Sequence, residues 1–328
     1  MIFWYLQIYL VLAIISSACD NSSSFSQSTF RTVAKLQSNS LQATTTNEGF
    51  ITVARSENSQ HQIAYRIARP MSLSSRQAAP IVALHGGPSL PSSYMYPLED
   101  VIPYRSIVYH DQLGCGKSDE PKDVSLYSIN NSVHDLKQLI KQLGIRRFHL
   151  YGHSYGGILA FEYMKSVANN KEDYAKCLSA ILSSAPTDIS RLENEFDRLT
   201  TELLKSEQKL NAQDLNELFR INYQCRLDEM PPQLANAYEN PGTVWFGTGV
   251  ISDYVAQPPS EDATRMPSAM IMRGEFDFVG PDSFDEWKRV FNHKFVRTKT
   301  LDGCSHHGLY ENGSLYGETI DSYFAEYD

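Results

Sequence analysis

A glycine-flanked serine, Ser154, places the strongest local constraint on how this chain folds. Gly152 and Gly156 lie two residues before and after it, in the pattern G-x-S-x-G. The apolar run 148–151 precedes the pattern, and apolar residues follow it at helical spacing over 158–167. A tight turn from a strand into a helix leaves no room for side chains beside its central residue, so glycine is required there. The sequence therefore predicts a strand, a sharp turn that exposes the Ser154 hydroxyl, and a helix.

Apolar runs and helical patterns alternate along most of the chain. Strands are expected at 50–54, 63–67, 80–84, 106–109, 148–151, 177–183, 268–272 and 295–300, and helices at 131–143, 158–167 and 315–327. The polar turn 56–60 joins the first two strands. This alternation predicts an α/β fold, with a mostly parallel sheet and helices on both of its faces. Segment 188–262 is polar and mostly helical, so we expect an inserted helical cap between the core segments 48–187 and 263–328.

A serine is a poor nucleophile unless a base takes its proton and an acid orients the base. In an open parallel sheet with this turn, the acid and then the base follow the serine along the chain. Asp277 follows the expected strand 268–272, and His306 follows the last strand. The ends of parallel strands meet at one edge of the sheet, so these side chains are predicted to join Ser154. The rivals are His307 for the base, and Glu275 or Asp302 for the acid.

The negative oxygen of a tetrahedral intermediate needs hydrogen-bond donors. The backbone N–H of Tyr155, directly after Ser154, is one candidate. The second is expected from the loop after strand 80–84, which reads His-Gly-Gly-Pro over 85–88. Its glycines allow the backbone to approach a ligand closely.

Charge and cysteine content exclude several other classes of function. The formal net charge of −9 argues against nucleic acid as a partner, because phosphate binding needs basic patches. Four cysteines of the folded part allow three complete disulfide pairings, and none of their spacings is typical of a metal site. These cysteines are Cys115, Cys177, Cys225 and Cys304. We expect buried thiols, and neither a metal nor a cofactor.

The N-terminus resembles an export signal. Residues 2–15 are almost wholly apolar, and small residues then precede Cys19. The apolar run is short for a membrane-spanning helix, which needs about 20 residues. Residues 1–19 are therefore predicted to be a signal peptide or lipoprotein signal, with Cys19 as a candidate for lipidation and membrane tethering. Residues 20–47 are polar and are expected to be a flexible tether. Export through such a signal would place the protein in the periplasm or outside the cell.

Five motifs occur together in the order and spacing of a known family. They read HGGP, DQLGCGKSDEP, GHSYGG, GEFD and GCSH. From about residue 47 to its end, the chain resembles the proline iminopeptidase family of α/β-hydrolases, and its motifs are most similar to those of the tricorn-interacting aminopeptidase. The resemblance implies that Ser154 is the nucleophile, Asp277 the acid and His306 the base. It also implies that Gly87 and Tyr155 supply the oxyanion N–H groups.

Three further positions bear on the resemblance outside the triad. Ser89 stands where the family usually has glycine, so the oxyanion loop is expected to sit differently. Asp111 and Gln112 lie in a loop that mostly supports the site in this family.

The resemblance is weakest at the substrate end of the site. Aminopeptidases of this family hold the free amine of the substrate with acidic residues, one of which directly follows the triad aspartate. Here that position is Phe278, and the local match for a second acidic residue, in the cap, is Val244. Glu217 or Glu239 are the candidates to replace them.

Three functions stay open from the sequence alone. The first is a serine peptidase that releases an N-terminal residue from a small peptide or amide. The second is an esterase or amidase for neutral acyl groups. The third is a non-catalytic binding protein on the same fold.

Overall fold

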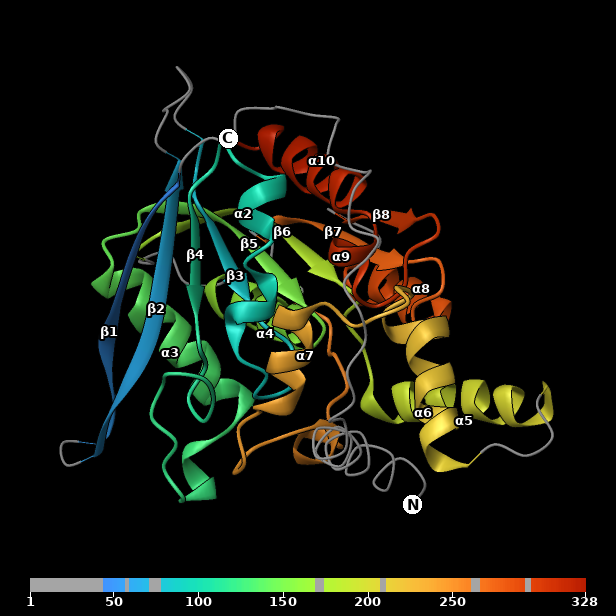
Figure 1. The fold of residues 1–328 in the computed structure, drawn as a ribbon. Coiled ribbons are helices and arrows are strands. Elements are labelled where there is room, and N and C mark those ends of the chain that lie inside the picture. Colours follow the sequence, from blue (N-terminus) through green and yellow to red (C-terminus); the bar gives the residue numbers. More distant parts are fainter. Residues whose placement is uncertain are drawn as a thin grey trace, which may run out of the picture.

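The computed structural model describes residues 44–56, 59–70, 78–168, 174–206, 211–260, 266–292 and 296–328. They contain one eight-stranded sheet in the order β1-β2-β4-β3-β5-β6-β7-β8. The strands are β1 Thr44–Ser56, β2 Ser59–Pro70, β3 Ile81–Leu84, β4 Ile107–His110, β5 Arg147–His153, β6 Lys176–Ser183, β7 Ser268–Gly274 and β8 Val296–Leu301. The β1–β2 and β2–β4 pairs are antiparallel, and all other pairs are parallel. Figure 1 shows β1 and β2 at one edge of the sheet and β8 at the other, so the prediction of a mostly parallel sheet is confirmed.

Helices connect the parallel strands. They are α2 Leu98–Val101, α3 Ile129–Gln142, α4 Tyr155–Ala168, α5 Ile189–Ser206, α6 Ala212–Phe219, α7 Pro232–Glu239, α8 Pro281–Val290, α9 Gly308–Glu311 and α10 Gly313–Ala325. Shorter helical turns are η1 Ser92–Met95, η2 Val124–Leu126, η3 Arg220–Gln224 and η4 Thr248–Ile251. Three of these helices were expected from the sequence, and each begins two or three residues earlier than its apolar pattern. Side chains set two of the starts, because Ser128 and Asn312 accept backbone N–H groups at the first turns of α3 and α10.

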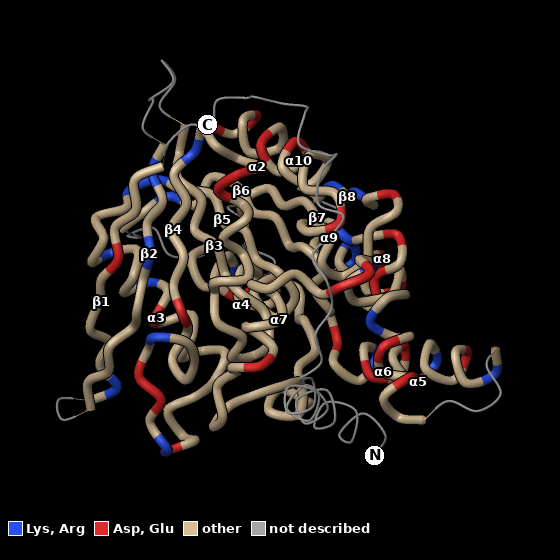
Figure 2. Tube along the Cα trace, in the orientation of Figure 1, with Lys and Arg blue, Asp and Glu red and all other residues tan. Residues whose placement is uncertain are grey.

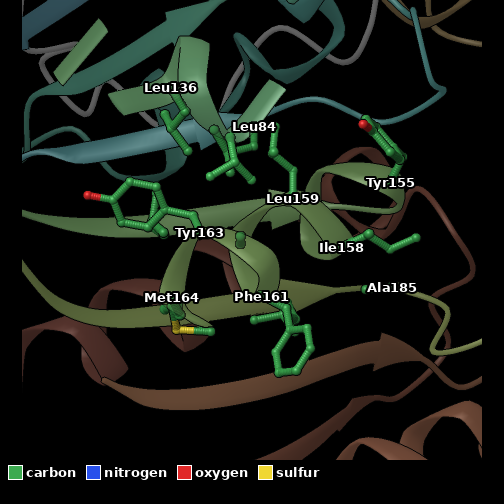
Figure 3. Close-up of a cluster of buried hydrophobic side chains, with 14 of the residues drawn as sticks. Leu84, Leu136, Tyr155, Ile158, Leu159, Phe161, Tyr163, Met164 and Ala185 are labelled. Atoms are coloured by element: carbon green, nitrogen blue, oxygen red, sulfur yellow. The ribbon is translucent and has the colours of Figure 1, made fainter. Parts of the chain in front are cut away.

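Both faces of the sheet are buried, as alternate residues of β3 show. Val82 and Leu84 pack in a cluster with α3, α4 and α8, whereas Ile81 and Ala83 pack in a second cluster with α2 and α10. Successive side chains of a strand point to opposite faces, so a strand covered on both sides needs an unbroken apolar run. Figure 3 shows Leu84 together with Leu159 of α4 in the first cluster. Helices therefore cover both faces, as predicted.

The segment between β6 and β7 holds α5, α6, η3, α7 and η4, where the sequence predicted the cap. In Figure 1, α5 and α6 (yellow) extend beyond the strands at the lower right, and α7 (orange) lies closer to the middle of the picture. A separate apolar cluster joins α5 to α6, and it consists of Leu199, Leu203, Leu215 and Phe219. Figure 2 shows acidic and basic residues interspersed along the trace, with both signs on α5 and α8.

The structure corrects the predicted start of the folded part. Residues 44–47, expected as the end of the tether, belong to β1 and pair with 67–70 of β2. The long partner strand explains the difference, because its backbone N–H and C=O groups offer pairing to a polar sequence as well as to an apolar one. The expected signal, the proposed lipidation of Cys19 and the rest of the tether lie outside the described residues, and they stay predictions.

Two further observations concern membrane-spanning helices and the cysteines. None of the helices in the described ranges is long and apolar enough to cross a membrane. The four cysteines predicted as buried thiols are free and buried.

Candidate active site

Ser154 lies at the turn between β5 and α4 with φ of 55°, in the left-handed region that non-glycine residues rarely adopt. The turn is held by a hydrogen bond from the Ser154 N–H to the Ser183 carbonyl at 2.8 Å. A side chain at Gly152 would collide with the backbone of Gly156, and one at Gly156 would collide with the carbonyl of Leu84. The glycines are therefore required by close backbone packing. The strained conformation resembles the backbone strain often stored at functional sites.

Asp277 follows β7 and contacts His306, which follows β8. The His306 Nδ1–H donates to Asp277 Oδ1 at 2.8 Å, and the Val279 N–H donates to the same oxygen at 2.9 Å. Burial on its own would raise the Asp277 pKa, but His306 and these hydrogen bonds outweigh it and hold that pKa below its ordinary value. An ionised Asp277 fixes the proton of His306 on Nδ1, so Nε2 carries the lone pair that a general base needs.

The rival residues have other partners. Nε2 of His307 is 2.8 Å from the hydroxyl of Tyr238 in the cap. Glu275 accepts the N–H of Gly303 at the surface. The structure thus brings His306, and not His307, onto Asp277.

Ser154 and His306 both line a cavity of about 140 Å³. Among the described residues, no hydrogen bond joins Ser154 Oγ to His306 Nε2. The hydrogen bond that the sequence predicted between these two atoms is therefore not formed in this structure.

The residues predicted to supply the oxyanion N–H groups are Tyr155, directly after the serine, and Gly87, which lines the same cavity. Tyr155 is the first residue of α4, so its N–H has no helical acceptor and lies at the positive end of the helix dipole. Gly87 has φ of 122°, and a side chain there would crowd the N–H groups of the next turn. An added Cβ at the neighbouring Gly86 would lie 3.0 Å from the Ser154 Cβ, which shows how closely this loop approaches the serine.

The loop 111–121 supports the oxyanion loop, as the family resemblance implied. The Gln112 N–H donates to His85 Nε2 at 2.9 Å, and its side-chain amide donates to the His85 carbonyl at 3.1 Å. Asp111 accepts the N–H groups of Ser92 and Lys117 at 2.8 and 2.9 Å. Both residues therefore hold neighbouring loops in place.

Ser89 stands where the family usually has glycine, and its contacts explain how the oxyanion loop accommodates a side chain there. Its φ is 69°, a conformation that favours glycine. Its hydroxyl donates to the Trp245 carbonyl of the cap segment at 2.6 Å, and its own carbonyl accepts the Gly242 N–H. The side chain that strains the loop also attaches it to the cap.

The cavity is walled mainly by apolar side chains. The principal ones are Leu90, Leu192, Phe196, Phe219, Phe246 and Phe278. Phe278 lies where the sequence predicted, and its ring stacks on His306 with 4.1 Å between centroids. Of the described residues that line the cavity, none is Asp, Glu, Lys or Arg. Burial lowers the pKa of the lining His307 well below its ordinary value, so this ring is neutral.

Two residues predicted to contact the substrate, Glu217 and Val244, do not line the cavity. Glu217 of α6 is half-exposed and pairs with Arg220 at 2.5 Å. Phe219 lines the cavity, and a residue two positions earlier points to almost the opposite side of a helix. Val244 packs against the core and donates its N–H to Glu120 at 3.2 Å. Glu239 is an exposed residue at the end of α7 and is not in the cavity wall either.

The aromatic wall that the cap supplies was not predicted from the sequence. Phe196 and Phe219 come from α5 and α6, and their rings stand 4.1 Å apart. Their apolar spacing within amphipathic helices is a detectable signal, but it identifies a buried face without saying what that face covers. Among the described residues, no group of His, Cys, Asp and Glu side chains has the arrangement of a metal site.

Comparison with known proteins places the chain in a family. The sequence profile of the Alpha/beta hydrolase family matches residues 81–315. The proline iminopeptidase of Lactobacillus helveticus is 35% identical over 297 residues, covering 82% of this chain and 96% of that protein. That of Saccharolobus solfataricus is 34% identical over 172 residues, covering 48% of this chain but only 54% of that protein, so this match spans about half of the relative's length.

Solved structures agree on the fold. The proline iminopeptidase of Mycobacterium smegmatis has a TM-score of 0.70 at 19% identity, covering 85% of this chain and 98% of that one. An esterase from Exiguobacterium antarcticum has a TM-score of 0.56 at 19% identity, covering 81% of this chain and 96% of that one. The chain is therefore a proline iminopeptidase-like member of the α/β-hydrolase family.

Proposed function

We propose that this chain is a serine hydrolase that cleaves a small amide or peptide through an acyl-enzyme on Ser154. One observation carries the proposal: the Asp277–His306 pair and the strained Ser154 turn share one cavity. The relatives that match by sequence support a hydrolase, because they are proline iminopeptidases.

In this proposal each residue has one task. His306 Nε2 takes the proton of Ser154 as its oxygen attacks the substrate carbonyl, and Asp277 stabilises the imidazolium that forms. The N–H groups of Gly87 and Tyr155 donate to the oxyanion. His306 then gives the proton to the leaving group, and a water molecule that His306 deprotonates hydrolyses the acyl-enzyme.

The first candidate for the substrate is a peptide or amide with a free N-terminal residue. The relatives from Lactobacillus helveticus and Saccharolobus solfataricus support this candidate, since both bear the name proline iminopeptidase. The aromatic walls of the cavity suit a compact apolar residue such as proline.

The second candidate is an ester or amide with a neutral acyl group. It is favoured by the absence of acidic side chains among the described residues of the cavity wall. A buried ammonium without a counter-charge costs several kcal/mol. The ring of Phe278 would recover only about 0.5–2 kcal/mol through a cation–π contact.

A fluorophosphonate probe tests the serine mechanism, because it reacts with activated serines. We expect one covalent adduct on Ser154, found by peptide mass spectrometry, and none in Ser154→Ala. A folded wild-type chain without an adduct would refute the proposal and favour a non-catalytic binding protein.

A panel of matched substrates separates the two candidates. It consists of proline 4-nitroanilide, N-acetylproline 4-nitroanilide and a short 4-nitrophenyl ester, assayed on one preparation. A higher kcat/KM for the free amine supports release of N-terminal residues and means that an acidic anchor exists. A higher value for the acetylated amide or the ester supports the neutral acyl substrate.

A further inference from the structure

We propose that Tyr94 and His153 are positioning residues that couple the oxyanion loop to the loop of the catalytic base. The inference rests on the proposed function, in which Ser154 and His306 react. Neither Tyr94 nor His153 has a part in the mechanism described above. Both are buried, with exposed fractions of 2% and 4%.

A continuous chain of hydrogen bonds links the two loops. The Gly86 N–H lies 2.7 Å from the Tyr94 hydroxyl oxygen, which lies 2.9 Å from His153 Nδ1. On the other side of the ring, His153 Nε2 lies 2.9 Å from the backbone carbonyl oxygen of His306. The chain thus runs from the residue before Gly87 to the backbone of the base.

The direction of every bond in this chain is determined. A carbonyl oxygen only accepts, so Nε2 of His153 must carry the proton that it donates to His306. A neutral imidazole then has its lone pair on Nδ1, and the Tyr94 hydroxyl must donate to it. The oxygen of Tyr94 is left to accept the Gly86 N–H, and donors and acceptors match throughout.

His153 stays neutral over the working pH range of a hydrolase. Burial, and next the positive charge that develops on His306, lower its pKa to about 3. It is therefore no substitute for His306 as the base. Its two ring nitrogens already have partners, Nδ1 the Tyr94 hydroxyl and Nε2 the His306 carbonyl.

The coupled loops carry groups that meet only in the transition state. The hydrogen bond from the Gly86 N–H to the Tyr94 hydroxyl holds the residue before Gly87, and the Gly87 N–H is a proposed oxyanion donor. The His306 carbonyl is held by His153, and the His306 N–H is held by the Tyr223 carbonyl of the cap at 3.3 Å. Small displacements of either loop would misplace the base or the donor, and preorganised donors act mainly on the transition state.

Tyr94→Phe tests the coupling, because it removes one hydroxyl and keeps the ring that lines the cavity. We expect kcat to fall about tenfold or more while KM changes less than about twofold. A boronic acid that mimics the tetrahedral intermediate should lose affinity by the same factor as kcat/KM. The matching carboxylic acid product should bind as it does to the wild-type chain. A loss of packing alone would not separate the two inhibitors.

A matched control removes a similar hydroxyl elsewhere. Tyr254 is partly buried, its hydroxyl donates to Glu162 Oε1 at 3.1 Å, and neither residue lines the cavity. Tyr254→Phe should leave kcat and boronate affinity unchanged. Thermal melting of both variants shows whether they are equally folded.

A double-mutant cycle with His153→Leu tests whether the two residues act as one unit. In a single chain of bonds, the double variant should lose no more activity than the worse single variant. Fully additive losses overturn the proposal, as does an unchanged boronate affinity in Tyr94→Phe. If the wild-type chain does not react with the fluorophosphonate, the proposed function is wrong. If it reacts, and Tyr94→Phe has the kcat and the boronate affinity of the wild-type chain, only the proposed coupling is wrong.

Discussion

Asp277→Asn is the substitution that most directly tests the assignment of the acid. In the wild-type chain Oδ1 of Asp277 accepts both the Nδ1–H of His306 and the N–H of Val279. An amide whose oxygen takes the place of Oδ1 keeps both hydrogen bonds but carries no negative charge. The imidazolium that forms when His306 Nε2 takes the proton of Ser154 therefore loses its counter-charge.

The expected loss follows from the missing charge. The same substitution in a Ser-His-Asp triad of another fold lowers kcat by about 10⁴. At about 1.4 kcal/mol for each factor of ten, the loss corresponds to about 5.5 kcal/mol of transition-state stabilisation. The fold should survive, because the hydrogen bond to Val279 is kept and no volume is removed.

The assay is kcat/KM on the best substrate of the panel, with circular dichroism to check the fold. The matched control is Glu275→Gln, which neutralises a surface carboxylate two residues away that accepts only the Gly303 N–H. It should retain kcat/KM within about twofold. An Asp277→Asn variant within tenfold of the wild-type chain, or a larger loss in Glu275→Gln, would refute this assignment of the acid.

Three further predictions concern stability. Burial first of all lowers the pKa of His110 and of His153 to about 3, so the unfolded chain binds more protons than the native one below about pH 6.5. The free energy of unfolding, measured in urea, should therefore fall from pH 6.5 towards 3 by up to about 1.4 kcal/mol per pH unit for each ring, and a flat profile would contradict it. Asp328→Asn removes the charge and one of the two oxygens that accept from the buried Arg105 at 2.9 Å; it should cost about 2–3 kcal/mol in the same assay, below the loss for a fully buried pair, and no change would contradict it. Gly156→Ala places a methyl group against the backbone at the end of β3; it should abolish soluble folded protein or fluorophosphonate labelling, and a fully labelled, folded variant would show that the turn relaxes.

Local patterns in the sequence were enough to predict several parts of this protein. The unbroken run at 81–84 predicts a strand covered on both faces, because period two leaves no polar side. The glycines beside Ser154 predict the turn, because the crowding that they relieve lies largely within neighbouring residues and the adjacent strand. Asp277 and His306 follow strands, and in a parallel sheet strand ends share an edge. Chain order was therefore enough to nominate them, and the contact between Asp277 and His306 separates His306 from its rival His307.

What surrounds these residues depends on how distant segments of the chain pack together. Tyr94 is 59 residues from His153 in the sequence, and His153 is 153 residues from His306, yet hydrogen bonds join them. No local pattern reveals such a contact, because it depends on which loops the sheet order brings together. The same holds for the cap: Glu217 and Phe219 are two residues apart, and the docking of α6 decides which one faces the cavity. Strand order and cap packing result from many weak long-range contacts, and local periodicity does not encode these contacts.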